Sequence, residues 1–196
     1  MTSPLKPATT QIFQFILELE KLKAVKRKTK TLSEDRYENS AEHSWQVALL
    51  ALSLAPYAHT PINIEQVVKM LLLHDIVEID TGDKIVYSTA HNDYENELKA
   101  AKRIFCLLPD TLGATYLALW LEFAAKKTSE AKFANAIDRL MPVLKNLSNQ
   151  GQSWVENNIK LEQVLSRNAV IADIHPELWE LIQEQLQDAA LQGYLR

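Results

Sequence analysis

The feature that most constrains the fold of this chain is an apolar run that ends in histidine and acidic side chains. Residues 70–83 read Met-Leu-Leu-Leu-His-Asp-Ile-Val-Glu-Ile-Asp-Thr-Gly-Asp, and between Met70 and Val77 only His74 and Asp75 are polar. An ionised carboxylate buried among aliphatic side chains is unstable unless it gains a partner. A fold that buries this segment must therefore supply a cation, and a buried arginine is the structural alternative to a metal ion.

The same segment predicts how its side chains are arranged. On a helix, Glu78 lies four positions after His74 and three after Asp75, so we expect these side chains to share one surface. Gly82 is a helix stop signal. Asp83, which follows it, is then free to point back towards the same surface.

The rest of the chain also reads as helices. It has four glycines among 196 residues, and strand-like alternation is scarce. Apolar spacing and capping residues predict helices over about 8–25, 40–55, 61–81, 94–108, 110–127, from 130 through a kink at Pro142, over 154–168 and from 176 onwards. Ile16 is expected on the buried face of the first helix, and residues 84–93 are expected to form a loop. We predict an all-α helical bundle in a single domain, residues 1–196.

Composition and charge narrow the cellular context. Hydrophobic residues make up 47% and charged residues 23% of the sequence, and no apolar stretch approaches the ~18 residues that a membrane span needs. The first residues lack the apolar core of a secretory signal, and a single cysteine, Cys106, cannot form an internal disulfide. The net charge of −4 argues against general nucleic-acid binding. We expect a cytoplasmic protein that binds neither membranes nor nucleic acids.

Two further polar residues fall on apolar helix faces. His43 precedes Val47 by one turn, and a single histidine in that position is more often a hydrogen-bonded core residue than a metal ligand. Asp138 lies in an apolar stripe with Ile137 and Met141, and an acidic residue there is uncommon unless it is paired or metal-bound. The adjacent Arg139 is expected to face another direction.

Together, His43, His74, Asp75 and Asp138 supply two imidazoles and two carboxylates from three helices. This set suits an octahedral divalent ion such as Mn²⁺, Co²⁺ or Fe²⁺. An open position on such an ion can hold a water with a lowered pKa. A buried hydrogen-bond network without metal is the open alternative.

A basic run, Lys26-Arg-Lys-Thr-Lys30, follows the first helix. It is most simply a solvated loop. In the sharper interpretation one of these cations reaches an anionic substrate, and Arg27 suits that role because a guanidinium can contact a phosphate through two N–H groups.

Three segments in a fixed order carry a resemblance to a known family. They are Ala41-Glu-His-Ser-Trp-Gln-Val-Ala48, His74-Asp-Ile-Val-Glu-Ile-Asp-Thr-Gly-Asp83, and Leu119-Trp-Leu-Glu-Phe123 with Glu130-Ala-Lys-Phe-Ala-Asn-Ala-Ile-Asp-Arg-Leu140. The chain resembles the HD-domain metal-dependent phosphohydrolases, with their H…HD…D motif, and within them the 5′-deoxynucleotidase branch. The resemblance implies an HD-type helical domain, usually a homodimer. It also implies one divalent ion, Mn²⁺, Co²⁺, Fe²⁺ or Mg²⁺, and removal of phosphate from deoxynucleoside 5′-monophosphates.

The resemblance also implies residue roles. The positions that match the family's metal ligands are His43, His74, Asp75 and Asp138. Glu78 matches the acid that handles the proton of the reaction, and Asp83 matches an acid near the substrate. Arg27 matches the arginine that meets the nucleotide, but Lys28 stands where the branch has an aromatic residue that helps to exclude the ribose 2′-hydroxyl.

Two alternatives remain at this stage. Guanosine tetraphosphate hydrolases of the same superfamily resemble His-Asp-x-x-Glu-Asp, whereas here Ile79 follows Glu78 and the next acid is Asp80. That mismatch favours hydrolysis of a simple monophosphate. The second alternative is a non-catalytic helical regulatory module that keeps a metal for stability, which would not need Glu78 or Asp83.

Overall fold

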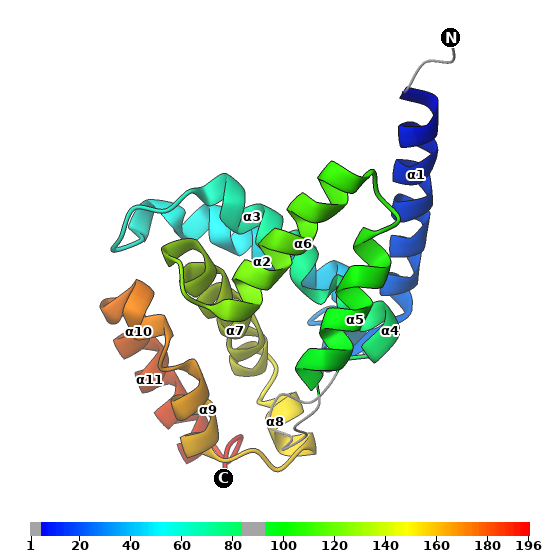
Figure 1. Ribbon diagram of the computed structural model, residues 1–196. Coiled ribbons are helices and arrows are strands. Elements are labelled where there is room, and N and C mark those ends of the chain that lie inside the picture. The colour runs from blue at the N-terminus through cyan, green and yellow to red at the C-terminus, as the bar shows by residue number, and fades with distance from the viewer. Residues whose placement is uncertain (1–4, 84–92) are drawn as a thin grey trace.

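The computed structural model of the protein describes residues 5–83 and 93–196 (Figure 1). In chain order the elements are α1 (Leu5–Glu18), η1 (Leu19–Ala24), β1 (Lys26–Lys30), β2 (Tyr37–Asn39), α2 (Ser40–Leu54), η2 (Ala55–Tyr57), α3 (Ile64–Leu73), η3 (His74–Val77), α4 (Glu78–Thr81), α5 (Asp93–Phe105), α6 (Asp110–Ala125), α7 (Ser129–Ser148), α8 (Gln152–Glu156), α9 (Leu161–Asn168), α10 (Ile171–Ile174) and α11 (Pro176–Leu191), where η marks a 3₁₀ helix. The predicted all-α class is confirmed. None of the helices in the described ranges is long and apolar enough to cross a membrane.

The basic run forms a strand rather than a solvated loop. β1 pairs antiparallel with β2, with Lys26 opposite Asn39 and Lys30 opposite Tyr37. Along β1 the burial alternates, so that Thr29 is buried and Arg27 half-buried while Lys28 faces solvent. This period of two is the mark of a strand with one covered face. Because nearly every residue in the run is cationic, hydropathy could not reveal it.

The hydrophobic core consists of two clusters that meet at the end of α3. The first cluster joins α2, α3 and α7 to α9–α11, and the second joins α1, α5 and α6. In Figure 1, α1 lies at one side of the molecule and α9–α11 at the other. Leu71 belongs to the first cluster, whereas Leu73 and Ile76 belong to the second. His74 therefore lies where the two clusters adjoin.

The central helix is not continuous, in contrast to the expectation for residues 61–81. After α3 the chain tightens into the 3₁₀ turn η3 and then continues as the short α4. With three residues per turn, the side chains at positions i and i+3 eclipse, so Asp75 aligns with Glu78. Gly82, with φ of 69°, ends α4 as the sequence predicted.

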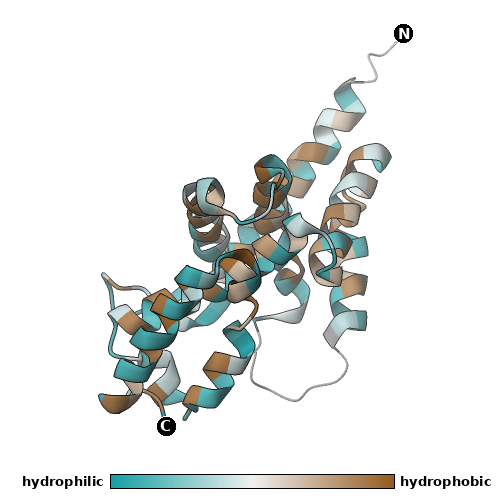
Figure 2. Cartoon of the chain, turned by 90° about the vertical axis from the view of Figure 1, so that its left-hand side faces the viewer, coloured by the Kyte–Doolittle hydropathy of each residue, from teal (hydrophilic) through white to brown (hydrophobic). Residues whose placement is uncertain are grey.

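α1 is only partly covered. Phe15 is buried in the second cluster, but Ile16, expected to be buried, is 54% exposed. Its neighbours Phe13 and Leu17 are exposed too. Figure 2 shows the resulting hydrophobic segments along the helix that leads to the N-terminus. The helical period was correct, but none of the elements within residues 5–83 and 93–196 covers this side of α1.

The C-terminal part is more divided than predicted. The expected helix over residues 154–168 is split into α8 and α9 by a turn in which Asn158 has a φ of 53°. α7 continues past Pro142 to Ser148. Most of the loop expected at residues 84–93, with His91, lies outside the described residues. That residues 1–196 form one domain stays a prediction.

Candidate metal centre

The start of α2 places His43. Asn39 and Glu42 form the capping box that the sequence predicts: Asn39 Oδ1 accepts a hydrogen bond from the Glu42 N–H at 3.0 Å, and Glu42 Oε2 accepts one from the Asn39 N–H at 3.1 Å. This fixes the first turn of α2. His43, in that turn, is fully buried and directed towards η3 and α7.

Side chains from α2, η3 and α7 converge beyond that turn. His43 Nε2 lies 2.9 Å from Asp138 Oδ1. His74 Nε2 lies 3.1 Å from Asp75 Oδ1 and 3.4 Å from Asp138 Oδ1. One possible ligand atom from each of His43, His74 and Asp75 lies within 4.8 Å of the other two, a group that could hold a metal ion. The structure therefore brings together all four residues predicted as ligands.

His74 supplies the test of whether a cation fits this place. Its Nδ1–H donates to the Leu71 carbonyl at 2.7 Å, which leaves Nε2 as the ligand nitrogen of the neutral ring. That Nε2 is buried and makes no hydrogen bond of acceptable geometry. A buried nitrogen with a lone pair beside two carboxylates is a suitable donor set for a divalent cation. The residues present fit a metal ion.

The charges in this group perturb one another. Burial alone would lower the pKa of His74, but the carboxylates of Asp75 and Asp138 outweigh it and raise that pKa to about 9. Burial does lower the pKa of His43, and the charge of Arg27 lowers it further. Burial acts to raise the pKa of Asp138, yet its bonds to the two histidines hold it well below the ordinary range. Without a cation, a protonated His74 takes over the neutralisation of the acids.

Glu78 follows on the next turn and lines a pocket beside the two histidines. Its side chain is mostly buried, and Ser40 Oγ donates a hydrogen bond to its Oε2 at 2.5 Å. Burial and the charge of Asp75 raise the pKa of Glu78 to about 8. Burial also raises the pKa of Asp83, to about 6, against the effect of Arg27. Two carboxyl groups near the centre can thus carry a proton near neutral pH.

Arg27 reaches the centre from β1. Its Nη1 lies 2.6 Å from Asp75 Oδ2 and 3.7 Å from Asp83 Oδ1, so Asp83 does point back as predicted. The same nitrogen is 4.0 Å from Glu78 Oε1. Burial alone would lower the pKa of Arg27, but these acids raise it above its ordinary value. The arginine is neutralised by protein carboxylates.

Sequence reasoning missed the pair Glu38 and Lys145. Glu38 is 1% exposed, its Oε2 accepts from Lys145 Nζ, and its Oε1 lies 3.5 Å from Arg27 Nε and 3.8 Å from His43 Nδ1. Glu38 thus stands behind both Arg27 and His43. One signal was available: Lys145 lies seven residues after Asp138 and four after Met141, on the buried face of α7.

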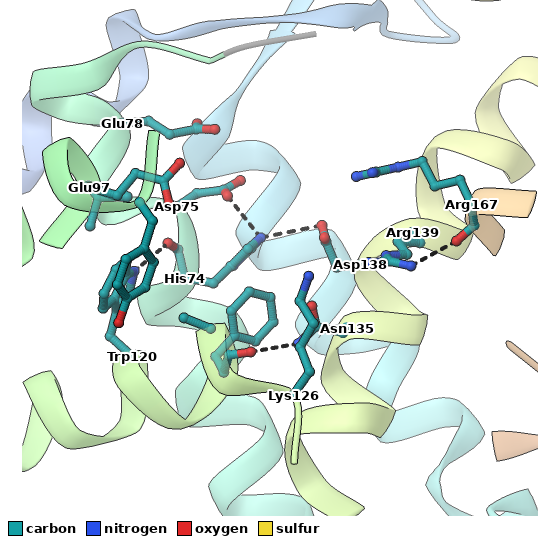
Figure 3. Close-up of a pocket in the computed structure, with 14 residues that line it drawn as sticks. His74, Asp75, Glu78, Glu97, Trp120, Lys126, Asn135, Asp138, Arg139 and Arg167 are labelled. Carbon is teal, nitrogen blue, oxygen red and sulfur yellow. Dashed lines mark hydrogen bonds and ion pairs between the residues drawn. The ribbon is translucent and has the colours of Figure 1, made fainter. Parts of the chain in front are cut away.

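A pocket of about 280 Å³ opens in front of His74, Asp75 and Asp138 (Figure 3). Aromatic and cationic side chains form much of its lining: Tyr94, Trp120 and Phe123, and Lys126, Arg139 and Arg167. Trp120 is a core residue as expected, and its Nε1–H donates to the His74 carbonyl at 3.1 Å. Arg139 makes no ion pair with Asp138, as expected, but it faces the same pocket. Arg27 is not among the lining residues.

Known proteins resemble this chain over most of its length. Residues 19–179 match the family described as HD domain. The crystal structure of a predicted metal-dependent phosphohydrolase from Magnetospirillum magnetotacticum MS-1 is 37% identical, covers 100% of this chain and 99% of its own, and superposes with a TM-score of 0.90. Human 5′-deoxynucleotidase HDDC2 is 24% identical over 176 residues, 88% of this chain and 83% of its own. A 5′-deoxynucleotidase of Erwinia tasmaniensis is 28% identical over 165 residues, 78% of this chain and 83% of its own.

Proposed function

The chain belongs to the HD-domain family of phosphohydrolases, and from that premise we propose that it removes the phosphate group from deoxynucleoside and nucleoside 5′-monophosphates. The two relatives named 5′-deoxynucleotidases, at 24% and 28% identity, support a nucleotide as the substrate. The proposed reaction transfers the phosphoryl group to water and releases a nucleoside.

In this proposal His43, His74, Asp75 and Asp138 hold one divalent cation, Mn²⁺, Co²⁺, Fe²⁺ or Mg²⁺. The cation, when bound, polarises a phosphoryl oxygen and lowers the pKa of a coordinated water. Glu38 stands behind the His43 ring, with its Oε1 3.8 Å from His43 Nδ1.

The protein supplies the proton chemistry and the positioning. Glu78, with a pKa raised to about 8, holds a proton at neutral pH and can give it to the leaving oxygen. Ser40 fixes its orientation. When the Asp75 carboxylate binds the cation, Arg27 can leave Asp75 and donate to a phosphate oxygen instead. Its positive charge then offsets the negative charge on the phosphoryl group during transfer. Asp83, 3.7 Å from Arg27, positions the sugar or leaving group.

One observation carries the proposal: Glu78 lies in the pocket wall next to a buried His-His-Asp group. A metal that served stability alone would not need it, which argues against the non-catalytic module. The guanosine tetraphosphate alternative needs a second acid after Glu78. The nearest acid is Asp80. Its carboxylate accepts hydrogen bonds of 2.5 and 2.6 Å from Arg103 of α5, and Asp80 does not line this pocket.

The decisive experiment is a screen of deoxynucleoside and nucleoside 5′-monophosphates with Mn²⁺, Co²⁺, Mg²⁺ and Zn²⁺, scored by released phosphate. We expect turnover that chelation abolishes and that Glu78→Gln lowers by about 10²- to 10⁴-fold. Asp80→Asn, on the same short helix, is the matched control and should retain activity. Full activity of Glu78→Gln would remove that residue from the mechanism, and release from guanosine tetraphosphate alone would favour the alternative.

The homodimer expected from the resemblance is also a proposal. The exposed apolar face of α1, formed by Phe13, Ile16 and Leu17, supports it, because monomeric proteins rarely leave such residues together in water. Phe13→Glu should shift the protein to the monomer in sedimentation velocity, and an unchanged sedimentation coefficient would exclude this face.

A further inference from the structure

Glu38 and His43 face each other across a gap that no hydrogen bond closes. Glu38 Oε1 lies 3.8 Å from His43 Nδ1, which is beyond the range of a hydrogen bond. Both atoms are buried, and neither has a hydrogen-bond partner. Buried polar atoms of folded proteins are nearly always paired, so two unpaired atoms that face each other need an explanation.

The other nitrogen of the His43 ring supplies that explanation. His43 Nε2 lies 2.9 Å from Asp138 Oδ1, and an ionised carboxylate can only accept a hydrogen bond, so Nε2 carries the proton of this contact. In the neutral ring, Nδ1 is then an acceptor without a proton, and it faces a second acceptor, Glu38 Oε1. Two acceptors cannot form a hydrogen bond with each other, so both remain unpaired.

The His43 ring cannot keep this tautomer when it binds a cation. A metal ligand must offer a lone pair, and in the neutral ring with a free Nε2 the proton is on Nδ1. The Nδ1–H then points at Glu38 Oε1, the carboxylate oxygen that lacks a partner. Closing the gap by about 1 Å brings the pair to the ordinary length of a charge-assisted hydrogen bond.

His74 already has the arrangement that His43 lacks. Its Nδ1–H donates to the Leu71 carbonyl at 2.7 Å, and its Nε2 has no hydrogen-bond partner. Histidines that bind metals usually donate their other N–H in this way, which fixes the ring and makes it a stronger ligand. The acceptor for His74 belongs to the backbone. The acceptor that faces His43 is a side chain, so a substitution can remove it.

The Glu38 carboxylate is held in place from the other side. Its Oε2 accepts a hydrogen bond from the Nζ of Lys145, which is buried on α7, and its Oε1 lies 3.5 Å from Arg27 Nε. Glu38 lies in β2, directly before the capping box that begins α2, and His43 lies in the first turn of that helix. The fold therefore positions Oε1 beside the His43 ring.

We propose that Glu38 is a positioning residue of the metal centre, whose Oε1 accepts the Nδ1–H of His43 when Nε2 of that ring binds the cation. Glu38 touches neither the cation nor the substrate and acts through His43. The inference rests on the cation site of the proposed function, and it names a residue that sets how tightly this site holds its ion.

The first test measures cation affinity without any nucleotide, by calorimetry with Mn²⁺ and Zn²⁺. Glu38→Leu combined with Lys145→Met removes the carboxylate together with its buried partner, so that no unpaired charge is left in the core. We expect the Kd of the ion to rise about 10- to 100-fold. Glu38→Gln combined with Lys145→Met should lie between this variant and the unsubstituted protein, because an amide oxygen can still accept the Nδ1–H.

The second test locates the ring protons by NMR of protein with ¹⁵N-labelled histidine. On loading with Zn²⁺, which is diamagnetic, the proton of His43 should move from Nε2 to Nδ1. In Glu38→Leu, Lys145→Met this Nδ1–H should lose its downfield shift. The Nδ1–H of His74 donates to a backbone carbonyl and should be unchanged, which makes it the control within the same spectrum.

An unchanged Kd in Glu38→Leu, Lys145→Met would overturn the proposal. So would a His43 proton that stays on Nε2 in the loaded protein, because Nδ1 would then have nothing to donate. Weaker binding together with a shifted His74 signal would assign Glu38 to the fold alone and overturn it as well.

Two outcomes separate this inference from the proposed function. If the unsubstituted protein binds no divalent ion, the cation site and the role of Glu38 both fall. If ion binding depends on Glu38 but no nucleotide releases phosphate, the proposed function alone is refuted.

Discussion

Arg27 and Lys126 both stand beside the carboxylates of the metal centre, but their surroundings differ. Arg27 has four acidic side chains within 4.0 Å, those of Glu38, Asp75, Glu78 and Asp83. Lys126 has none among the described residues. Both residues border the same cluster of acidic side chains, so the presence of nearby acids does not explain why only Arg27 is paired with them. Arg27 on β1 is therefore part of the folded charge network, whereas Lys126 borders the pocket outside that network.

The comparison teaches how to separate structural from ligand-binding charges in one site. A buried charge that is fully paired contributes to stability, and removing its partner exposes the cost of burying it. A charge that faces a pocket without a partner contributes little to stability. Its removal should be seen only when the ligand is present.

The largest expected effect is on stability at the paired side. Lys145→Met leaves Glu38 buried without its amino partner and should lower the free energy of unfolding by about 3–5 kcal/mol, measured by urea denaturation. The double variant Glu38→Leu, Lys145→Met should recover much of that loss. Lys126→Met should change stability by less than about 0.5 kcal/mol. Equal losses of unfolding free energy in Lys145→Met and Lys126→Met would contradict this distinction between paired and unpaired charges.

The next effect is on catalysis by Arg27. Arg27→Gln should lower kcat/KM by about 10²- to 10³-fold for every phosphorylated substrate, because the lost charge faces the transferring group itself. Arg36→Gln, at the exposed end of the hairpin, is the control, since it loses surface ion pairs alone. If Arg27→Gln lowered kcat/KM for only some of these substrates, the charge of Arg27 would not face the transferring group.

The third effect concerns the metal-free protein and pH. Folding raises the pKa of Glu78 from its ordinary value of 4.5 to about 8 and that of His74 from 6.5 to about 9. Both groups bind protons more tightly in the folded state, so the stability they confer is present at low pH and is lost as pH rises through these values. In chelator, the melting temperature should fall by several degrees between pH 6.5 and 9.

Two measurements check this pH dependence. Glu78→Gln should flatten the lower half of the profile, and saturating Mn²⁺ should restore stability at pH 9, because deprotonated ligands bind the ion. A metal-free melting temperature that rises with pH over this range would contradict the assigned directions.

The smallest effect concerns the sugar. Lys28 faces solvent on the side of β1 opposite Arg27, so no aromatic wall at this position excludes the ribose 2′-hydroxyl. The ratio of kcat/KM for deoxyadenosine and adenosine 5′-monophosphate should lie within about threefold of one. Lys28→Trp should raise the preference for deoxyribose, whereas a strong preference in the unsubstituted protein would place sugar selection elsewhere.

The sequence predicted which side chains meet at the candidate centre, because each of them interrupts an apolar helix face. His43, His74 and Asp138 could be placed from their neighbours at three and four positions. The cap of α2 was equally local, since Asn39 and Glu42 satisfy each other's backbone groups. These features depend on residues that are close together in the sequence, so the spacing of apolar and capping residues indicates them directly.

Other features depended on tertiary packing that the sequence does not display. The 3₁₀ turn that aligns Asp75 with Glu78 arises where α3 passes from one core cluster to the other. Glu38 and Lys145 are 107 positions apart and meet only in the fold. Ile16 has the spacing of a core residue and yet is 54% exposed in the part of the chain that the structure describes. The pocket lining likewise required distant segments to be placed together.

The hydrogen bond between Trp120 and the His74 carbonyl has a spectroscopic consequence. It couples the indole to the backbone of a residue whose imidazole borders the metal centre, so any rearrangement on loading with metal alters the polarity around that chromophore. Co²⁺ and Mn²⁺, which quench fluorescence at short range, should dim its emission more than that of Trp154 and Trp179, which belong to the other core cluster. The protein thus contains its own optical reporter of metal occupancy, readable without any label.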